Sequence, residues 1–171
     1  LGVNCSNITD FKQLTSTSTI IWDLIYCASS YVDDNRVNVN DMVNINFNLK
    51  YEYDNTLFTS GNVWIEGIPA VNLNNGTWRI TDSESNVNSK QYDEFSATGT
   101  LYEITKVDQN NQSETVIWDK IILENIDASD NRANIGDDVT IDVTLVYEYD
   151  GAAVTDGEVT ISGVRWDKKP T

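Results

Sequence analysis

Two loops rich in carboxylate and amide side chains hold the residue types that bind calcium. They read YVDDNRVNVND (31–41) and DASDNRANIGDD (127–138). Calcium prefers about six to eight oxygen ligands, and such a loop at one end of a sheet can supply them. In the alternative, each loop is a solvated turn whose Asp caps the chain and pairs with Arg36 or Arg132. The candidate calcium ligands are Asp33, Asp34, Asp41, Asp127, Asp130, Asp137 and Asp138.

Catalytic chemistry is poorly supported by the same inventory of residues. The chain has no histidine, so a serine or cysteine nucleophile has no imidazole base beside it. A glycosidase needs one specialised pair of carboxylates across a cleft, and acids that recur in duplicate do not single out such a pair. The sequence therefore predicts a protein that is not an enzyme, with calcium as the one possible cofactor.

Aromatic side chains on an outer face would suit either a subunit interface or a sugar. Trp64 is expected on the outward face of its strand, and Trp166 and Trp78 lie near turns. A ring in such a place can stack on a glycan or pack against a neighbouring subunit. Trp22 and Trp118, which occupy matching places in two copies of a repeat, are predicted to lie in cores.

Covalent modification is predicted from two further residue types. Four Asn-x-Ser/Thr sequons occur, and two of them fall within the first nine residues, which favours a glycosylated exterior protein. Cys5 and Cys27 can form one disulfide, which would fix the N-terminal segment, or can remain buried thiols. The predicted glycosylation sites are Asn4, Asn7, Asn75 and Asn111.

The charge balance narrows the possible partners. Asp and Glu number 27 against 11 Lys and Arg, for a net charge of −16. A surface with that charge repels phosphate backbones, so nucleic-acid binding is not expected. No apolar run approaches the length that spans a bilayer, so no membrane span is expected either.

The elements that position these residues come from a sequence repeat. DNRVNVNDMVNINFNLKYEYDN (34–55) returns as DNRANIGDDVTIDVTLVYEYDG (130–151), 96 positions later and without a gap. IIWDLI (20–25) likewise returns as VIWDKI (116–121), and GNVWIEG (61–67) returns as GEVTISG (157–163). A period near 100 is too long for a solenoid and fits a complete small domain.

Within the repeat the apolar pattern is that of β-strands. Odd positions from Val43 to Tyr53 are apolar or aromatic and even positions are polar. The second copy repeats this from Val139 to Tyr149, with Val146 as an apolar residue at an even position. Shorter strands are expected at 20–26, 62–66, 77–81, 116–123 and 158–162, with a strand pair or one bent strand at 95–107. The prediction is an all-β fold of immunoglobulin-like antiparallel β-sandwich repeats.

The copies are of unequal length, which suggests how the molecules join. We expect one complete repeat at 20–115, an incomplete second repeat at 116–171, and at 1–19 the last strand of a repeat. A sandwich without a strand leaves an apolar face wet and backbone groups unpaired. Residues 1–19 of one subunit would then complete 116–171 of the next, and head-to-tail repetition of this contact builds a filament. Ile8, Phe11, Leu14, Trp64 and Trp166 are the predicted interface residues.

The string IIWD…DDNRVNVND…VNINFNLKYEYD…GNVWIEG…NNGTW…VIWDKI resembles the immunoglobulin-like repeats of large archaeal cell-surface proteins. The resemblance covers residues 20 to about 166. It implies an extracellular, cell-surface location and a structural or adhesive role, either S-layer-associated or in a filament of self-associated copies. It brings no active-site residue. A glycan-binding adhesin and a fragment of a longer S-layer-type array are the alternatives.

Overall fold

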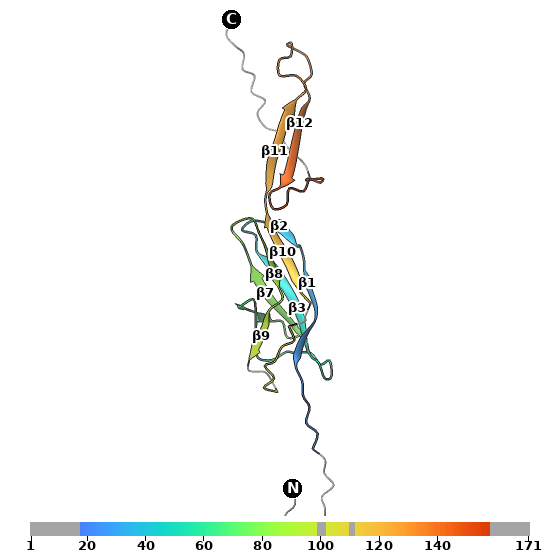
Figure 1. Cartoon of the computed structure of the whole chain (residues 1–171), viewed down its shortest axis with the longest axis vertical. Coiled ribbons are helices and arrows are strands. Elements are labelled where there is room, and N and C mark those ends of the chain that lie inside the picture. The colour runs from blue at the N-terminus through green and yellow to red at the C-terminus, as the bar shows by residue number, and fades with distance from the viewer. Residues whose placement is uncertain (1–17, 99–101, 110–111, 158–171) are drawn as a thin grey trace, which may run out of the picture.

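The structure is a computed structural model that describes residues 18–98, 102–109 and 112–157. These residues form an all-β protein with several antiparallel sheets and no helix. Figure 1 shows an elongated molecule in which one group of sheets lies between two projections. The hairpin β11–β12 projects from one end, and the extended segment 18–24 leaves from the other.

The first unit of the fold is built on a four-stranded sheet. Its strand order is β1-β3-β7-β6, with β1 at Ile25–Val32, β3 at Val43–Tyr51, β7 at Thr77–Asp82 and β6 at Val71–Asn72. All of its neighbours pair antiparallel. The longest strand, β3, is therefore flanked by β1 and β7 and lies in the middle of the sheet.

Two three-stranded sheets complete the first unit. One has the order β2-β10-β8, with β2 at Arg36–Asn38, β10 at Glu114–Asp119 and β8 at Asn88–Tyr92. The other has the order β5-β4-β9, with β5 at Ile68–Pro69, β4 at Asn62–Ile65 and β9 at Phe95–Thr98. The pairing of β10 with β2 is parallel, and the others are antiparallel.

One hydrophobic core joins the three sheets. The odd-numbered residues of β3, from Val43 to Tyr51, are all buried, as the period-two pattern predicts. Phe47 of β3 meets Phe95 of β9 edge to face, with ring centroids 5.1 Å apart. The indole nitrogen of Trp78 donates to the Phe58 carbonyl oxygen at 2.9 Å, so this buried ring also satisfies its polar atom.

Two residues of the alternating stretch depart from the expectation. Asn46 lies on the polar side of β3 and is nevertheless buried, because Arg79 of the neighbouring strand donates to its side-chain oxygen at 2.9 Å. Tyr53 lies beyond the end of β3 in the turn and is exposed. Burial of Asn46 depends on a cross-strand neighbour, which the alternation of a single strand does not specify.

The first unit ends four residues later than the predicted boundary at 115. Val116 and Trp118 of β10 are completely buried in its core, and Asp119 is the last residue of that strand. The segment expected as one strand at 116–123 is thus divided between β10 and β11, which belong to different sheets. Its N-terminal counterpart is also not a strand from 20 onward, since β1 begins at Ile25.

The hairpin β11–β12 repeats the geometry of β1–β3. With β11 at Ile121–Ala128 and β12 at Ile141–Tyr147, Ile121 pairs with Tyr147 just as Ile25 pairs with Tyr51. A register shift falls after Cys27 in one hairpin and after Leu123 in the other, again 96 positions apart. The sequence repeat is therefore a repeat of backbone geometry, down to the same irregularity.

The predicted strands at 62–66 and 77–81 correspond to β4 and β7. The stretch predicted as a strand pair or one bent strand at 95–107 contains β9 and a single bridge in which Val107 lies parallel to Ile25. The predicted strand at 158–162 lies outside the described residues. Within the ranges that the structure covers, we find no helix with the length and apolar character needed to span a bilayer.

Candidate functional site

The most elaborate polar site lies at the joint between the first unit and the hairpin. Only Lys120 separates β10 from β11, so the last strand of one unit leads directly into the first strand of the next. The Asp119 carboxylate is buried there and accepts hydrogen bonds from the backbone N–H of Lys120 at 2.8 Å and of Tyr149 at 3.0 Å. Asp119 thereby fixes the start of β11 against the turn that follows β12.

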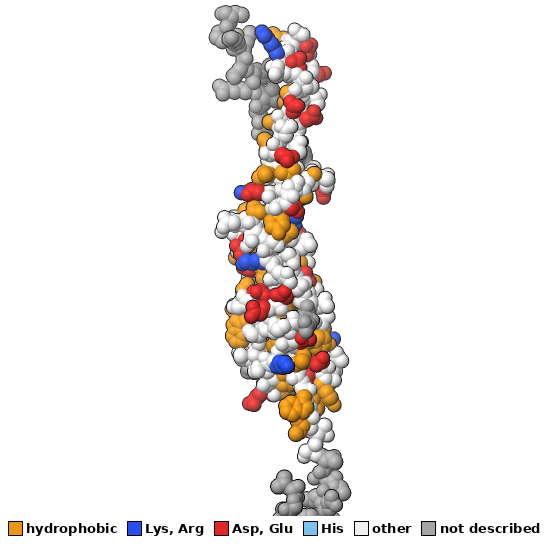
Figure 2. All heavy atoms as spheres, viewed as in Figure 1, with side chains coloured by type: hydrophobic (Ala, Val, Ile, Leu, Met, Phe, Trp, Pro, Cys, Tyr) orange, Lys and Arg blue, Asp and Glu red, His pale blue; other side chains and the backbone are white. Residues whose placement is uncertain are grey.

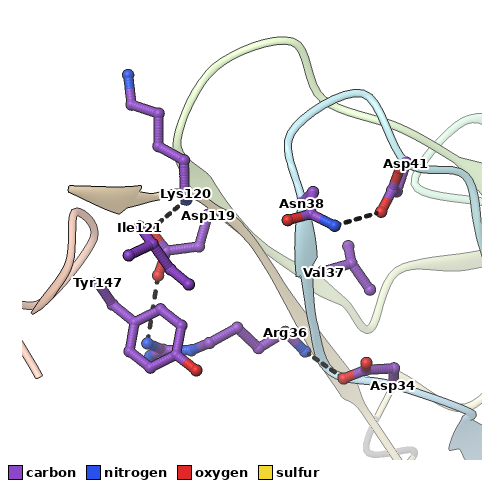
Figure 3. A pocket seen from close by; sticks show the side chains of 9 residues that line it. All are labelled: Asp34, Arg36, Val37, Asn38, Asp41, Asp119, Lys120, Ile121 and Tyr147. Atoms are coloured by element: carbon purple, nitrogen blue, oxygen red, sulfur yellow. Dashed lines mark hydrogen bonds and ion pairs between the residues drawn. The ribbon is translucent and has the colours of Figure 1, made fainter. Parts of the chain in front are cut away.

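Arg36 connects the two units across this joint. Its guanidinium lies 3.2 Å from Asp119 Oδ2 and makes two contacts with Asp150, of 2.5 and 3.3 Å. It also stacks on the Tyr147 ring, with its central carbon 4.6 Å from the centroid (Figure 3). Because Arg36 comes from β2 and the other three residues come from β10, β12 and the following turn, the contact holds the hairpin in one orientation.

The charge of Asp150 is maintained by the same contacts. Its hydrogen bonds from the Arg36 guanidinium and from the Ala152 backbone hold the pKa of this carboxyl below its usual range. A hollow of about 410 Å³ opens beside the contact and is lined by Asp34, Arg36, Val37, Asn38, Asp41, Asp119, Lys120, Ile121 and Tyr147 (Figure 3). The site therefore combines several carboxylates with two cations, a set suited to holding two parts of a protein together.

The other end of the first unit carries the same frame without the arginine. Asp23 Oδ1 accepts from the backbone N–H of Leu24 at 2.8 Å and of Tyr53 at 2.9 Å, as Asp119 does 96 positions later. The Glu52 N–H donates to the Leu24 carbonyl, and the counterpart Glu148 N–H donates to the Lys120 carbonyl. Segment 18–24 is thus bound to the first unit by hydrogen bonds equivalent to those that join the end of β10 and the start of β11 to the hairpin.

Apolar side chains at both ends of the molecule are exposed although their counterparts are buried. Ile20 and Trp22 are 73% and 88% exposed, whereas Val116 and Trp118 have no exposed surface. Ile121, Leu123 and Ile141 of the hairpin are exposed, whereas Ile25, Cys27 and Ile45 are buried. Figure 2 shows hydrophobic side chains on the outside of the molecule at both ends of the first unit. These surfaces are candidate contact faces, because each has the composition of a core.

The predicted calcium ligands do not gather in the structure. Among the described residues, no group of three carboxylate, histidine or cysteine side chains is placed to hold a metal ion. Instead, Asp34 and Asp130 each accept the backbone N–H of the arginine two residues later, and Asp41 and Asp137 accept from Asn38 and Asn134. The loops are turns closed by their own side chains. Asp33, Asp127 and Asp138 likewise belong to no such group within the covered ranges.

The predicted modification and interface residues are only partly described. Asn75 is exposed in the turn between β6 and β7, where its side-chain oxygen accepts the Thr77 N–H. Cys27 is buried, and burial raises the pKa of its thiol to about 11. Trp64 is half-buried on β4 rather than fully outward. The remaining residues lie outside the described ranges: Asn4, Asn7, Asn111, Cys5, Ile8, Phe11, Leu14 and Trp166.

Two expectations about single residues differ from the structure. Arg36 does not pair with Asp34 through its guanidinium; only its backbone N–H bonds to that residue, and the side chain reaches Asp119 and Asp150. Trp118 is in the core as predicted, but Trp22 is exposed, because no other described strand flanks it. The recurrence of Trp-Asp and Asp-Asn-Arg in both copies was the available signal for the joint, and nothing in one sequence shows that these strings meet.

Comparison of the chain with protein-family models, with curated proteins and with solved structures found no match. The geometry of the joint and the difference in burial between the two copies are the features of this chain that bear on its function.

Proposed function

We propose that the protein is a non-enzymatic structural subunit of an extracellular surface filament, built from immunoglobulin-like sandwich units that join head to tail by β-strand complementation. The observation that carries this proposal is the contrast between Trp22 and Trp118. These two residues occupy the same place in the repeat, and Trp22 is exposed while Trp118 is fully buried in the core of the first unit. The predicted donor strand at 1–19 lies outside the described residues up to position 17. The segment that bears Trp22, 18–23, corresponds to β10, the last strand of the first unit, and lies outside any described sheet.

The partner for this strand is the hairpin unit of another copy. In the first unit, β10 lies beside β2 and carries Val116 and Trp118 into the core formed with β1 and β3. Segment 18–23 of a second copy, placed beside residues 132–134, would bring Ile20 and Trp22 over the hairpin β11–β12. Burial of two such side chains contributes about 4 kcal/mol before the cost of association is subtracted.

A repeat array in which neighbouring units belong to one chain is the second candidate. The feature that favours it is the edge of β12 equivalent to the edge of β3 that pairs with β7. In the first unit, Trp78 and Ile80 of β7 cover that part of the core. Segment 18–23 corresponds to β10 and not to β7, so it would leave this edge of β12 to be covered by another strand, which a neighbouring unit of an array would supply. Both candidates use the same joint and differ in whether assembly depends on protein concentration.

An exterior location fits the remaining surface features. The net charge of −16 keeps separate copies apart unless a specific contact joins them. Asn75 of the Asn75-Gly76-Thr77 sequon is exposed in a turn, as an N-glycan acceptor must be.

The test is whether the purified chain assembles, and through which residue. We expect sedimentation velocity to show species that grow with concentration, and negative-stain microscopy to show fibres. Trp22→Glu should abolish both, because it places a charge in the proposed core. Val71→Glu is the matched control, because Val71 is also exposed but lies on the edge strand β6. Monomers at all concentrations, or equal assembly of the Trp22→Glu variant, would refute the filament.

A further inference from the structure

The residues that make the Arg36 contact inside the chain have sequence equivalents near the two ends of the described molecule. Each residue of the Arg36 contact has an equivalent 96 positions away: Arg36 corresponds to Arg132, Asp119 to Asp23, and Asp150 to Asp54. Arg132 lies between β11 and β12, whereas Asp23 belongs to segment 18–24 and Asp54 to the turn after β3, whose Tyr53 N–H donates to Asp23. Segment 18–24 leaves the first unit at the end opposite to the hairpin (Figure 1). One chain thus presents the two halves of this contact at its two ends.

The arginine half is already arranged as in the internal contact. The Arg132 backbone N–H donates to Asp130 Oδ1 at 2.8 Å, as the Arg36 N–H donates to Asp34 Oδ1 at 3.0 Å. The turn that follows is also the same, since the Asp137 N–H donates to the Asn134 carbonyl as Asp41 does to Asn38. Arg132 is exposed, and the part of the chain that the structure describes contains no ion pair of its side chain.

The carboxylate half is arranged in the same way. Asp23 Oδ1 accepts the two backbone hydrogen bonds that Asp119 Oδ1 accepts at the internal joint. Asp54 accepts from the Thr56 hydroxyl at 2.7 Å and from its backbone N–H at 3.0 Å, and these bonds hold the pKa of this carboxyl below its usual range. Asp54 is therefore ionised at neutral pH, and neither it nor Asp23 has an ion-pair partner among the described residues.

Exposed apolar residues lie beside both the arginine half and the carboxylate half, which favours a second copy of the chain as the partner. Ile135 and Trp22 are the most exposed of the large hydrophobic residues described, at 95% and 88%. Their counterparts Val39 and Trp118 both pack on the core of the first unit. At the internal joint, the Val39 N–H donates to the Asp119 carbonyl and the Trp118 indole donates to the Asp41 carbonyl. The two most exposed residues, Ile135 and Trp22, are therefore the equivalents of two residues that are packed at the internal joint.

We propose that Arg132 of one copy binds Asp23 and Asp54 of a second copy, in the contact that Arg36 makes with Asp119 and Asp150 within the chain. This inference rests on the proposed function and specifies its register. Residues 21–23 of the second copy pair in parallel with 132–134, as Ile117–Asp119 pairs with Arg36–Asn38. Trp22 then donates its indole N–H to the Asp137 carbonyl, and Ile135 covers the adjoining apolar surface.

The contact gives orientation to copies that otherwise repel each other. Each chain carries an excess of 16 negative charges, so random approach is unfavourable at low ionic strength. One guanidinium placed between two carboxylates reverses the sign of the interaction locally and selects a single docking register. The ion pair is thus a determinant of which ends meet, beside the apolar contact that supplies the affinity.

Charge reversal tests the contact. We expect Arg132→Glu to raise the concentration needed for assembly by at least about tenfold at low salt, measured by sedimentation velocity. Lys50→Glu makes the same change in net charge on β3, at a residue that takes no part in the proposed ion pair, and should leave that concentration within about twofold of the wild-type value. Arg132→Glu combined with Asp54→Lys should recover assembly, because the two charges are exchanged.

The outcomes separate this inference from the proposed function. If the wild-type chain assembles and Arg132→Glu assembles equally well, the Arg132 contact is wrong and strand complementation stands. If the wild-type chain assembles and the double charge exchange gives no recovery over Arg132→Glu, the pairing with Asp54 is wrong. If the wild-type chain stays monomeric at every concentration, the proposed function fails, and this inference fails with it.

Discussion

The hairpins β1–β3 and β11–β12 are the same structure in two environments. Both have the same pairing, the same register shift, and the same closing hydrogen bonds, from the Tyr51 N–H to Thr56 and from the Tyr147 N–H to Ala152. In the first, the inward side chains are covered by β7, β9 and β10. In the second, Ile121, Leu123 and Ile141 are exposed, and the equivalent positions nearer the joint, Val143, Leu145 and Tyr147, are only half-buried. Backbone geometry is therefore specified within about 30 residues of local sequence, whereas burial depends on strands that come from elsewhere.

This difference assigns separate roles to the two copies. The first unit has a closed core, whereas the hairpin has exposed apolar side chains and, in our proposal, acts as the acceptor for another copy. Arg36 and Asp119 set the direction of the hairpin, because their contact joins β2 and β10 to the hairpin.

The tryptophan pair should give the largest contrast. Trp118→Ala removes a fully buried ring and the hydrogen bond to the Asp41 carbonyl, and we expect a loss of about 4 kcal/mol in the free energy of unfolding. Trp22→Ala should change the stability of the monomer by less than about 0.5 kcal/mol, because its ring is exposed. Urea denaturation of dilute protein measures both. Equal losses would mean that Trp22 has a core environment in the monomer.

The isoleucine pair Ile45 and Ile141 tests the hairpins themselves. Ile45→Ala should cost about 3 kcal/mol because Ile45 is fully buried in β3. Ile141→Ala, at the equivalent position of β12, should cost under about 1 kcal/mol in dilute monomer. In assembled protein, we expect Ile141→Ala to increase the hydrogen exchange of the hairpin β11–β12 more than Ile45→Ala does. The prediction fails if Ile141→Ala destabilises the dilute monomer as much as Ile45→Ala.

The arginine pair tests the joint. Arg36→Ala leaves the buried Asp119 carboxylate without its cation, and we expect a loss of about 2 kcal/mol together with faster exchange at the start of β11. Arg132→Ala should leave the stability of the monomer unchanged within about 0.5 kcal/mol. Thermal melts and exchange rates of residues 121–128 provide the measurement. If exchange in β11 is the same in both variants, Arg36 does not orient the hairpin.

A smaller effect is expected from acid. Burial raises the pKa of Asp82, but hydrogen bonds from Tyr92 and Lys90 outweigh it, so the folded-state pKa lies below the usual value. A carboxyl whose pKa is lowered on folding stabilises the fold above its unfolded pKa, near 3.9, and loses this contribution as the pH falls through the folded value. Tyr92→Phe removes one of these hydrogen bonds. The free energy of unfolding should then fall by about 1 kcal/mol less than in the wild-type protein when the pH is lowered from neutral to below 4. An unchanged profile of stability against pH would contradict this assignment.

Sequence alone was sufficient to predict single strands and their buried faces. It was insufficient to predict which distant strands share a core. The alternation from Val43 to Tyr51 predicted a strand and its buried face, and the 96-residue period predicted the second hairpin. The same reasoning placed the end of the first unit at 115, because the period shows where a repeat recurs but not which core a strand joins. Val116 and Trp118 belong to the core of the first unit only through pairing with β2 and β8.

The candidate site was less predictable for the same reason. Acidic loops suggested calcium, but their carboxylates accept hydrogen bonds from neighbouring backbone and amide groups and form no three-residue cluster in the described ranges. The Arg36 contact joins residues as far as 114 positions apart in sequence. Such a contact is determined by how β2, β10 and β12 meet in space, and one unaligned sequence has no pattern that reports it.

The most direct measurement is hydrogen–deuterium exchange of residues 18–23 in dilute and assembled protein. In the monomer these backbone amides lie outside any described sheet, and we predict rapid exchange. In the assembled state they should become as protected as those of β10, and the hairpin β11–β12 should gain protection with them. Assembly that leaves residues 18–23 exchanging at the monomer rate would contradict the claim that this segment completes the unit of another copy.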